Sequence, residues 1–242
     1  MIKMMILAPR RPAFTRQGFR DYVVNTHGPL VKSIEEVAAG IQRYHYNFPI
    51  DGVDDQVFGH PHADEFDIFT QAWFDSLAAH RDNQKHPRYM AVIRPDEEVM
   101  ADNSRALFHY TIEHDVIAGP AGAFKLFYTR RRKLGMTRTE FQAAWLTRMS
   151  EAFSKSASAA SVVERYVQNH ALPEADHPAD PESRYYDVID EFALRAPSDW
   201  AGLAQDAKLV ANIKAIEADL LAPGTTRSFF AETVINIAGP QD

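Results

Sequence analysis

The pattern of apolar and polar positions predicts the same series of elements twice along the chain. Residues 2–7 form an apolar run typical of a strand, and residues 15–39 place apolar side chains at helical spacing. Residues 42–48 alternate between polar and aromatic side chains, which is typical of a strand with two different faces. Each half therefore reads strand, helix, strand, strand, helix, strand. The expected elements are residues 2–7, 15–39, 42–48, 66–74, 76–83, 96–100 and 107–114, followed by 124–129, 137–158, 165–170, 185–192, 198–221 and 229–237.

The residues themselves repeat together with this pattern. Phe19 and Phe141 lie 122 positions apart, as do Arg43 and Arg165, and the segment FDIFTQ resembles YDVIDE 120 positions later. The segment AGPAG separates the two halves with residues that favour a turn. The order βαββαβ is that of a ferredoxin-like unit, an antiparallel sheet with both helices on one face, and two such sheets can pack together within one chain. The sequence therefore predicts two tandem units, residues 1–117 and 123–242.

The composition narrows the classes of function. The chain has 242 residues, a formal net charge of −7 and no cysteine, which excludes disulfides, thiolate catalysis and cysteine-bound clusters. The dense basic run Arg130–Lys133 is short, so nucleic-acid binding is not expected. No apolar stretch approaches the ~20 residues of a membrane span. We therefore expect no membrane partner and a cytoplasmic location.

The first long helical stretch carries a histidine on its apolar face. At helical spacing, Phe19 and His27 fall on the side that should enter the core. Pro29 lacks a backbone donor and disfavours the helical conformation at Gly28, so the helix is expected to kink or restart there, with His27 at the end of a segment. The second half has Met149 at the position of His27, which indicates that the fold does not require an imidazole at this place.

Several segments together resemble a known family. They are the strand IKMMIL, the block RRPAFTRQGFRDYVVNTHGPLV, the strand RYHYN and the segment FTQAWFDS, repeated as FKLFYTRRRKLGMTRTEFQAAWLTRM, RYVQNH and YDVIDEF. These segments resemble the EthD family of the dimeric α+β barrel superfamily. The resemblance implies an α+β fold in which two tandem ferredoxin-like βαββαβ units pack sheet-to-sheet as an intramolecular dimeric α+β barrel. Ordinary members match one half and dimerise, so this chain resembles a fused dimer, present as a monomer or as a further homodimer.

The resemblance also implies a class of chemistry. EthD members are associated with microbial degradation or modification of small organic molecules. Related barrels dehydrate, isomerise, cyclise, decarboxylate or oxygenate aromatic and polyketide-like substrates, often without a cofactor, and the fold does not choose among these reactions. Met149 and Glu151 stand at the positions of His27 and Pro29 in the second half, so we expect one working cavity, in the first unit, and a degenerate second site.

Three residues are the catalytic candidates. His27 would act as a general acid or base, since imidazole transfers protons near neutral pH. The alternative is a structural histidine that binds a carbonyl freed by Pro29. Tyr46 would donate a hydrogen bond to a carbonyl or phenolate oxygen, and its neighbour His45 is the third candidate. Because successive strand residues point to opposite faces, His45 and Tyr46 cannot line the same cavity.

Three aromatic residues are the candidates for substrate binding. Tyr22 lies shortly before His27, Trp73 lies near the end of the third expected strand, and Tyr44 shares a strand face with Tyr46. Together they would form an aromatic wall for an apolar substrate. Packing in the core is the alternative role for each of them.

A metal or another cofactor is not expected. His60 and His62, with Asp64 or Glu65, form the one grouping with metal-binding character. Histidines in such a polar loop are more often solvated, so we predict no metal site. The sequence has no phosphate-binding glycine loop and no nucleophile elbow.

The sequence and the resemblance together predict a cofactor-free enzyme that acts by proton transfer on a small apolar, aromatic or polyketide-like molecule. Dehydration, elimination or isomerisation, with His27 as acid or base, is the primary interpretation, and it makes the protein a lyase or an isomerase. The first alternative is a cofactor-independent monooxygenase. The second is a non-catalytic protein that binds a small molecule in catabolism.

Overall fold

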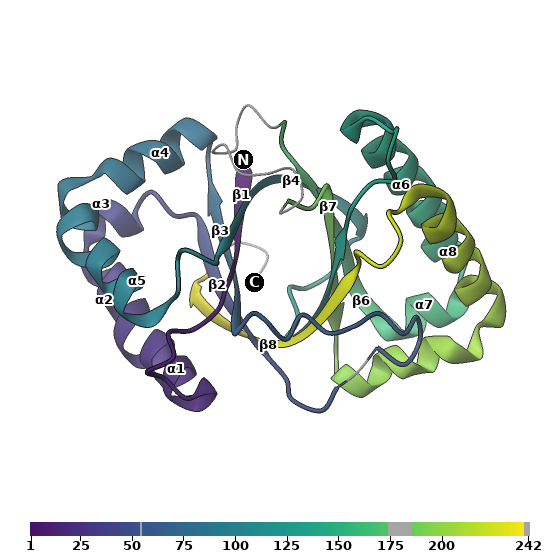
Figure 1. Ribbon diagram of the computed structural model, residues 1–242, viewed down its shortest axis with the longest axis horizontal. Coiled ribbons are helices and arrows are strands. Elements are labelled where there is room, and N and C mark those ends of the chain that lie inside the picture. The colour runs from purple at the N-terminus through teal and green to yellow at the C-terminus, as the bar shows by residue number, and fades with distance from the viewer. Residues whose placement is uncertain (54, 174–184, 240–242) are drawn as a thin grey trace. The chain divides into compact units, whose positions relative to one another are not determined.

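The computed structural model describes residues 1–53, 55–173 and 185–239, and its contacts group them into two compact units (Figure 1). Of the described residues, the first unit contains 1–48, 64–111 and 233–239, and the second contains the rest of 49–63 and 112–232. Each unit therefore combines most of one half of the sequence with a segment of the other half. The boundaries 1–117 and 123–242 remain a prediction about the duplicated sequence.

The first unit has the predicted βαββαβ order. It consists of β1 Ile2–Ala8, α1 Arg16–Tyr22, the π-helical turn η1 Val23–His27, α2 Gly28–Ser33, α3 Glu35–Ala38, β2 Arg43–Pro49, β3 Ile68–Phe74, α4 Leu77–Lys85, the π-helical turn η2 Tyr89–Ile93, α5 Arg94–Met100 and β4 Leu107–Ile117. The sheet runs β4–β1–β3–β2 with antiparallel neighbours, and Met4 lies opposite Ala72 and Tyr110. The helices cover one face of this sheet (Figure 1).

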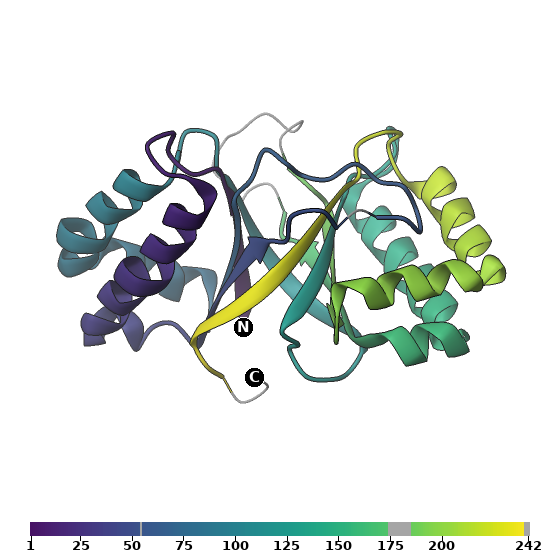
Figure 2. The same cartoon turned by 90° about the horizontal axis from the view of Figure 1, so that it is seen from below.

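The second unit repeats this arrangement. It consists of β5 Phe124–Arg130, α6 Arg138–Ser154, α7 Ala157–Val162, β6 Val163–Ala171, β7 Val188–Leu194, the 3₁₀ helix η5 Pro197–Gln205, α8 Ala207–Leu220 and β8 Arg227–Ile237. Its sheet runs β8–β5–β7–β6, again antiparallel throughout. In both units the helices lie on one face of the unit's own sheet (Figure 2). A large apolar cluster fills the space between these helices and the sheet of the second unit.

A contact between an arginine and an aspartate repeats at the end of the first strand of each unit. The main-chain N–H of Arg10 donates to Asp67 Oδ2 at 2.9 Å, and its guanidinium pairs with the same carboxylate. Arg132 makes the same two contacts with Asp187, the N–H contact at 2.8 Å. These residues lie at the offsets of 122 and 120 found in the sequence, so the duplication extends from the sequence to local geometry.

The helix that carries His27 changes its hydrogen-bond pattern at the predicted place, where η1 ends and α2 begins at Gly28. Gly28 nevertheless keeps helical dihedral angles, φ −59° and ψ −50°. The Gly28 N–H donates to the carbonyl of Val23, five residues earlier, and α2 then begins with Pro29 in its first turn. The wider π-helical turn and the missing Cβ of Gly28 make room for the proline ring. His27 ends a helical segment, as predicted.

Several helix boundaries differ from those predicted. The helix expected at 198–221 is two segments, because the Asp206 carboxylate accepts the N–H of Leu209 at 2.9 Å and starts α8 there. Ser156 caps α7 in the same way and divides the helix expected at 137–158. The short helix expected at 96–100 begins earlier, since Tyr89–Ile93 already forms a helical turn. Each difference comes from a local cap or turn that the apolar periodicity does not report.

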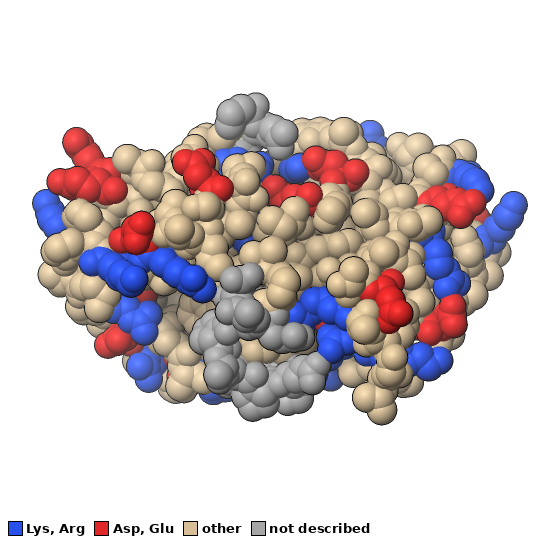
Figure 3. All heavy atoms as spheres, turned by 90° about the horizontal axis from the view of Figure 1, so that it is seen from above, with Lys and Arg blue, Asp and Glu red and all other residues tan. Residues whose placement is uncertain are grey.

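Charged side chains of both signs are interspersed on the face shown in Figure 3. This distribution agrees with the modest negative net charge of the sequence and lacks, over the described residues on that face, the continuous basic surface that nucleic acids require. Within the described ranges, no helix combines the length and the apolar character of a membrane-spanning segment.

Candidate active site

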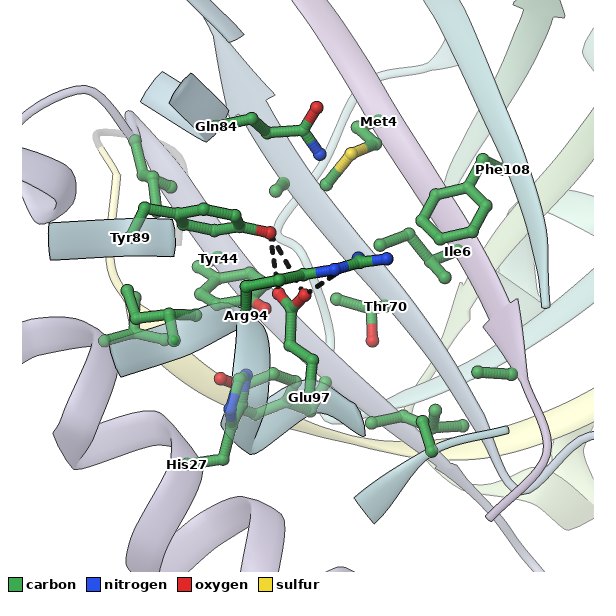
Figure 4. A pocket seen from close by; sticks show the side chains of 18 of the residues that line it. Met4, Ile6, His27, Tyr44, Thr70, Gln84, Tyr89, Arg94, Glu97 and Phe108 are labelled. Carbon is green, nitrogen blue, oxygen red and sulfur yellow. Dashed lines mark hydrogen bonds and ion pairs between the residues drawn. The ribbon is translucent and has the colours of Figure 1, made fainter. Parts of the chain in front are cut away.

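A cavity lies between the sheet and the helices of the first unit (Figure 4). Its volume is about 80 Å³. Much of its wall is apolar, and polar side chains enter it from η1, β2, β3, α4, η2 and α5. An apolar pocket with a few converging polar groups is typical of a small-molecule site. The apolar wall includes Met4, Ile6, Phe19, Ile68, Ile93 and Phe108, and the polar side chains include His27, Tyr44, Tyr46 and Glu97.

His27 is held by a carboxylate at one of its ring nitrogens. Nδ1 lies 2.7 Å from Asp96 Oδ2, and the His27 side chain is 1% exposed. Because an ionised carboxylate only accepts hydrogen bonds, this contact places the proton of the neutral imidazole on Nδ1. Nε2 is then the basic nitrogen, and the described part of the chain gives it no hydrogen-bond partner. The arrangement leaves Nε2 available to a molecule in the cavity.

Asp96 is also bound by a tyrosine. The hydroxyl of Tyr22 donates to Asp96 Oδ1 at 2.5 Å. Burial favours the neutral acid, but the hydrogen bonds from His27 and Tyr22 outweigh this effect and lower the pKa of Asp96. The same hydrogen bond raises the pKa of Tyr22 to about 12. Asp96 is therefore ionised near neutral pH and is suited to fix the orientation and tautomer of His27.

Two tyrosines of β2 face the same cavity. The rings of Tyr44 and Tyr46 lie 4.8 Å apart. Burial raises the pKa of both tyrosines above the usual value, so both stay protonated. The Asn236 side chain donates to the Tyr46 oxygen at 3.4 Å. A protonated phenol hydroxyl can donate a hydrogen bond, so either tyrosine can bind a substrate oxygen in the cavity.

Glu97 follows Asp96 on α5 but has different surroundings. Its two carboxyl oxygens accept from the Tyr89 hydroxyl at 2.9 and 3.1 Å, and Arg94 Nη1 lies 3.4 Å from one of them. Burial raises the pKa of Glu97, although the charge of His27 and the contacts with Tyr89 and Arg94 act in the opposite direction. Asp96 and Glu97 are thus neighbouring carboxyl groups whose pKa values move in opposite directions.

The structure brings together some of the predicted site residues and separates others. His27, Tyr44 and Tyr46 line one cavity, and Tyr22 joins them through Asp96 rather than through the cavity wall. His45 and Trp73 lie on the opposite face of the sheet, where their rings pack 4.8 Å apart. This separation follows from strand alternation, which had already excluded a shared cavity for His45 and Tyr46.

Different side chains stand at the corresponding positions of the second unit. Met149, at the position of His27, is buried. Arg130 stands at the position of Ala8, and its guanidinium lies 2.8 Å from Asp190 and 2.6 Å from Glu217. His60 Nε2 contacts the same Glu217 carboxylate at 3.0 Å. The second unit thus has a buried ion-pair network at positions that correspond to part of the cavity wall of the first unit.

The two loop histidines have separate partners. His60 contacts Glu217, and His62 Nε2 lies 3.4 Å from the main-chain N–H of Phe230. Within residues 1–53, 55–173 and 185–239, no three histidine, aspartate or glutamate side chains are placed to hold a metal ion.

Sequence reasoning missed the α5 residues of the site. The helix expected at 96–100 contains Asp96 and Glu97 but gives neither residue a role, and Tyr89 lies outside the expected elements. One available signal was the repeat, because Glu97 and Glu217 are 120 positions apart, the same offset as that of the third strands. A carboxylate at matching positions of both halves marks a place where the fold accepts a buried acid.

Comparison with known proteins agrees with the architecture and with part of the chemistry. The sequence model of the EthD domain matches residues 11–104, so the first half of the chain contains an EthD domain. A curated relative, the conidial pigment biosynthesis dehydratase EthD of Metarhizium robertsii, is 27% identical over 111 residues. The match covers 44% of this chain and 78% of the relative.

Solved structures match nearly the whole chain. A candidate monooxygenase of Fusobacterium nucleatum matches with a TM-score of 0.60 and 10% identity, over 98% of this chain and 94% of the other. An anthrone oxidase-like protein matches with a TM-score of 0.58 and 10% identity, over 98% and 93% of the two chains. At this identity the likeness defines the fold alone. The chain shares the dimeric α+β barrel fold of these structures, and each of its units supplies a four-stranded antiparallel sheet.

Proposed function

We propose that the first unit is a dehydratase, a lyase that removes water from a small and largely apolar hydroxy-carbonyl compound. The observation that carries the proposal is the contact between Asp96 and His27, which leaves Nε2 as the basic nitrogen beside an apolar cavity. Orientation by a carboxylate is a common way to prepare a histidine for proton abstraction. The dehydratase name of the Metarhizium robertsii relative supports the same reaction class.

The chemistry begins at the carbon next to the substrate carbonyl. His27 Nε2 takes a proton from this carbon, and the electron pair of the C–H bond forms the new carbon–carbon double bond as the C–O bond of the hydroxyl group breaks. The charge that grows on the carbonyl oxygen would be stabilised by a hydrogen bond from the hydroxyl of Tyr46 or Tyr44, since a donor held in place acts most strongly where charge develops. Asp96 would stabilise the imidazolium that results.

The test uses compounds whose reactions separate the proposed steps. A tetralone without a hydroxyl group reports proton abstraction alone, as exchange of its α-protons for deuterium in heavy water. A hydroxytetralone carrying the hydroxyl group β to the ketone reports dehydration, because loss of water gives a fluorescent naphthol. We expect the wild type to accelerate both reactions, and His27→Ala to lose about 10²–10⁴-fold in both, the usual contribution of a general base.

His86→Ala is the matched control, because His86 follows α4 outside the cavity wall and its ring accepts from the nearby main-chain N–H of Arg88 at 3.3 Å. Unchanged turnover in His27→Ala would contradict the proposal. Turnover that stops without oxygen would assign the protein to the monooxygenases instead. Binding of the tetralones without any reaction would favour the non-catalytic alternative.

A further inference from the structure

The cavity contains a second carboxyl group that proton abstraction by His27 does not use. Glu97 lines the cavity, and its side chain is 21% exposed. The Tyr89 hydroxyl donates to both of its oxygens, so the carboxyl group is held in one orientation. Figure 4 draws this group between Tyr89 and His27, with the Arg94 side chain alongside.

The two acidic residues at the start of α5 have different proton affinities. Asp96 carries hydrogen bonds from His27 and Tyr22 that favour its ionised form. Glu97 faces an apolar wall, and burial raises its pKa. Two carboxyl groups whose surroundings drive their pKa values apart are the arrangement that supports one ionised and one proton-donating role in a single site.

Dehydration needs a proton donor as well as a base. A hydroxyl group leaves as hydroxide only with difficulty, and protonation of its oxygen as the C–O bond breaks turns it into water. His27 Nε2 cannot supply this proton while it accepts the one from carbon. We propose that Glu97 is the acid that protonates the departing hydroxyl group, an inference that rests on the proposed dehydratase function.

Atoms and charges balance in this step. The substrate loses one proton to His27 and one hydroxyl group, Glu97 gives its proton to the hydroxyl oxygen, and the products are the unsaturated carbonyl compound and water. His27 becomes an imidazolium and Glu97 becomes a carboxylate. The Tyr89 hydroxyl and Arg94 Nη1 already lie within 3.4 Å of this carboxylate, and the imidazolium attracts it. Transfer of the proton from His27 back to Glu97 restores the starting state.

The experiment compares three tetralones in the wild type and in Glu97→Gln. The amide that replaces the carboxyl group keeps an oxygen that can accept from Tyr89 but has no acidic proton. We expect α-proton exchange of the unsubstituted tetralone to stay within about threefold of the wild-type rate, because His27 and Asp96 are intact. Loss of water from the hydroxytetralone should fall by about 10²-fold or more, the usual contribution of a general acid. The third compound is an acetoxytetralone, which carries an acetate group in place of the hydroxyl group. Glu97→Gln should eliminate acetate from it at nearly the wild-type rate, because acetate leaves without protonation.

The control is Glu98→Gln, which changes the next residue of α5, whose side chain is 57% exposed. We expect this variant to behave as the wild type with all three compounds. Undiminished dehydration of the hydroxytetralone by Glu97→Gln would overturn the assignment. An equal loss with all three compounds would also overturn it, because it would show that Glu97 supports binding or folding. Inactivity of the wild type toward all three would contradict the proposed function itself, and the role of Glu97 with it.

Discussion

Replacement of Asp96 by asparagine tests how the site controls its histidine. The aspartate accepts from two donors, His27 at 2.7 Å and Tyr22 at 2.5 Å. Asparagine has one oxygen and one NH₂ group in place of the two carboxylate oxygens. It can therefore accept a hydrogen bond from His27 or from Tyr22 at these positions, but not from both. If its oxygen binds Tyr22, its NH₂ group faces Nδ1 of His27, and the imidazole must carry its proton on Nε2. The nitrogen that faces the cavity is then no longer a base.

The expected effects of Asp96→Asn follow from this geometry. Proton abstraction should fall by about 10²–10⁴-fold, since the base is present in the wrong tautomer. Hydrogen bonds to a charged group contribute about 1.5–3 kcal/mol each, and relief of the buried charge offsets part of the loss. We therefore expect a net destabilisation of about 1–3 kcal/mol, which lowers Tm by roughly 2–12 °C in a chain of this size.

Deuterium exchange of tetralone and thermal unfolding measure the two effects of Asp96→Asn, with Glu98→Gln as the control. Because the pKa of Asp96 is lowered in the folded protein, its contribution to stability is present above the unfolded-state pKa and is lost as the pH falls through the folded-state pKa. The difference in Tm between wild type and variant should therefore disappear in acid. A variant that exchanges tetralone protons at the wild-type rate would refute the role of Asp96.

Two further predictions concern stability, one through a packing contact and one through a buried ion pair. Gly28→Ala would place a Cβ 2.8 Å from Asn236 Oδ1 and 3.2 Å from the Val23 carbonyl oxygen, and we expect a net loss of about 1 kcal/mol in unfolding free energy, because overpacking outweighs the better helix propensity of alanine. Asn236→Ser in the same chain should remove only the part of the penalty that comes from the Asn236 contact. Arg130→Met leaves the buried Asp190 without its ion-pair partner, and chemical denaturation should show a loss of about 3–5 kcal/mol. A loss below about 1 kcal/mol would mean that Asp190 is protonated in the folded protein.

The apolar pattern predicted the elements of both units and the strand faces correctly. The alternation of β2 placed Tyr44 and Tyr46 on one face and His45 on the other, and the cavity has this arrangement. The pattern failed at the helix interruptions. A kink or restart is predicted at Pro29, but the π-helical turn that precedes the new segment is not, because periodicity reports which residues are buried and not how the backbone is hydrogen-bonded.

Only the tertiary structure decided which residues share the site. His27 and Asp96 are 69 positions apart, on η1 and α5, and no local pattern relates them. Their contact depends on how two helices pack across one sheet, as does the contact of Glu97 with Tyr89. The sequence by itself determined the duplicated βαββαβ order and the presence of the histidine in only one copy. It also placed this imidazole, a group suited to proton transfer, on the apolar face of a helix. Its acidic partners were decided by packing, because hydrogen bonds between distant residues depend on positions in space and leave no period in the sequence.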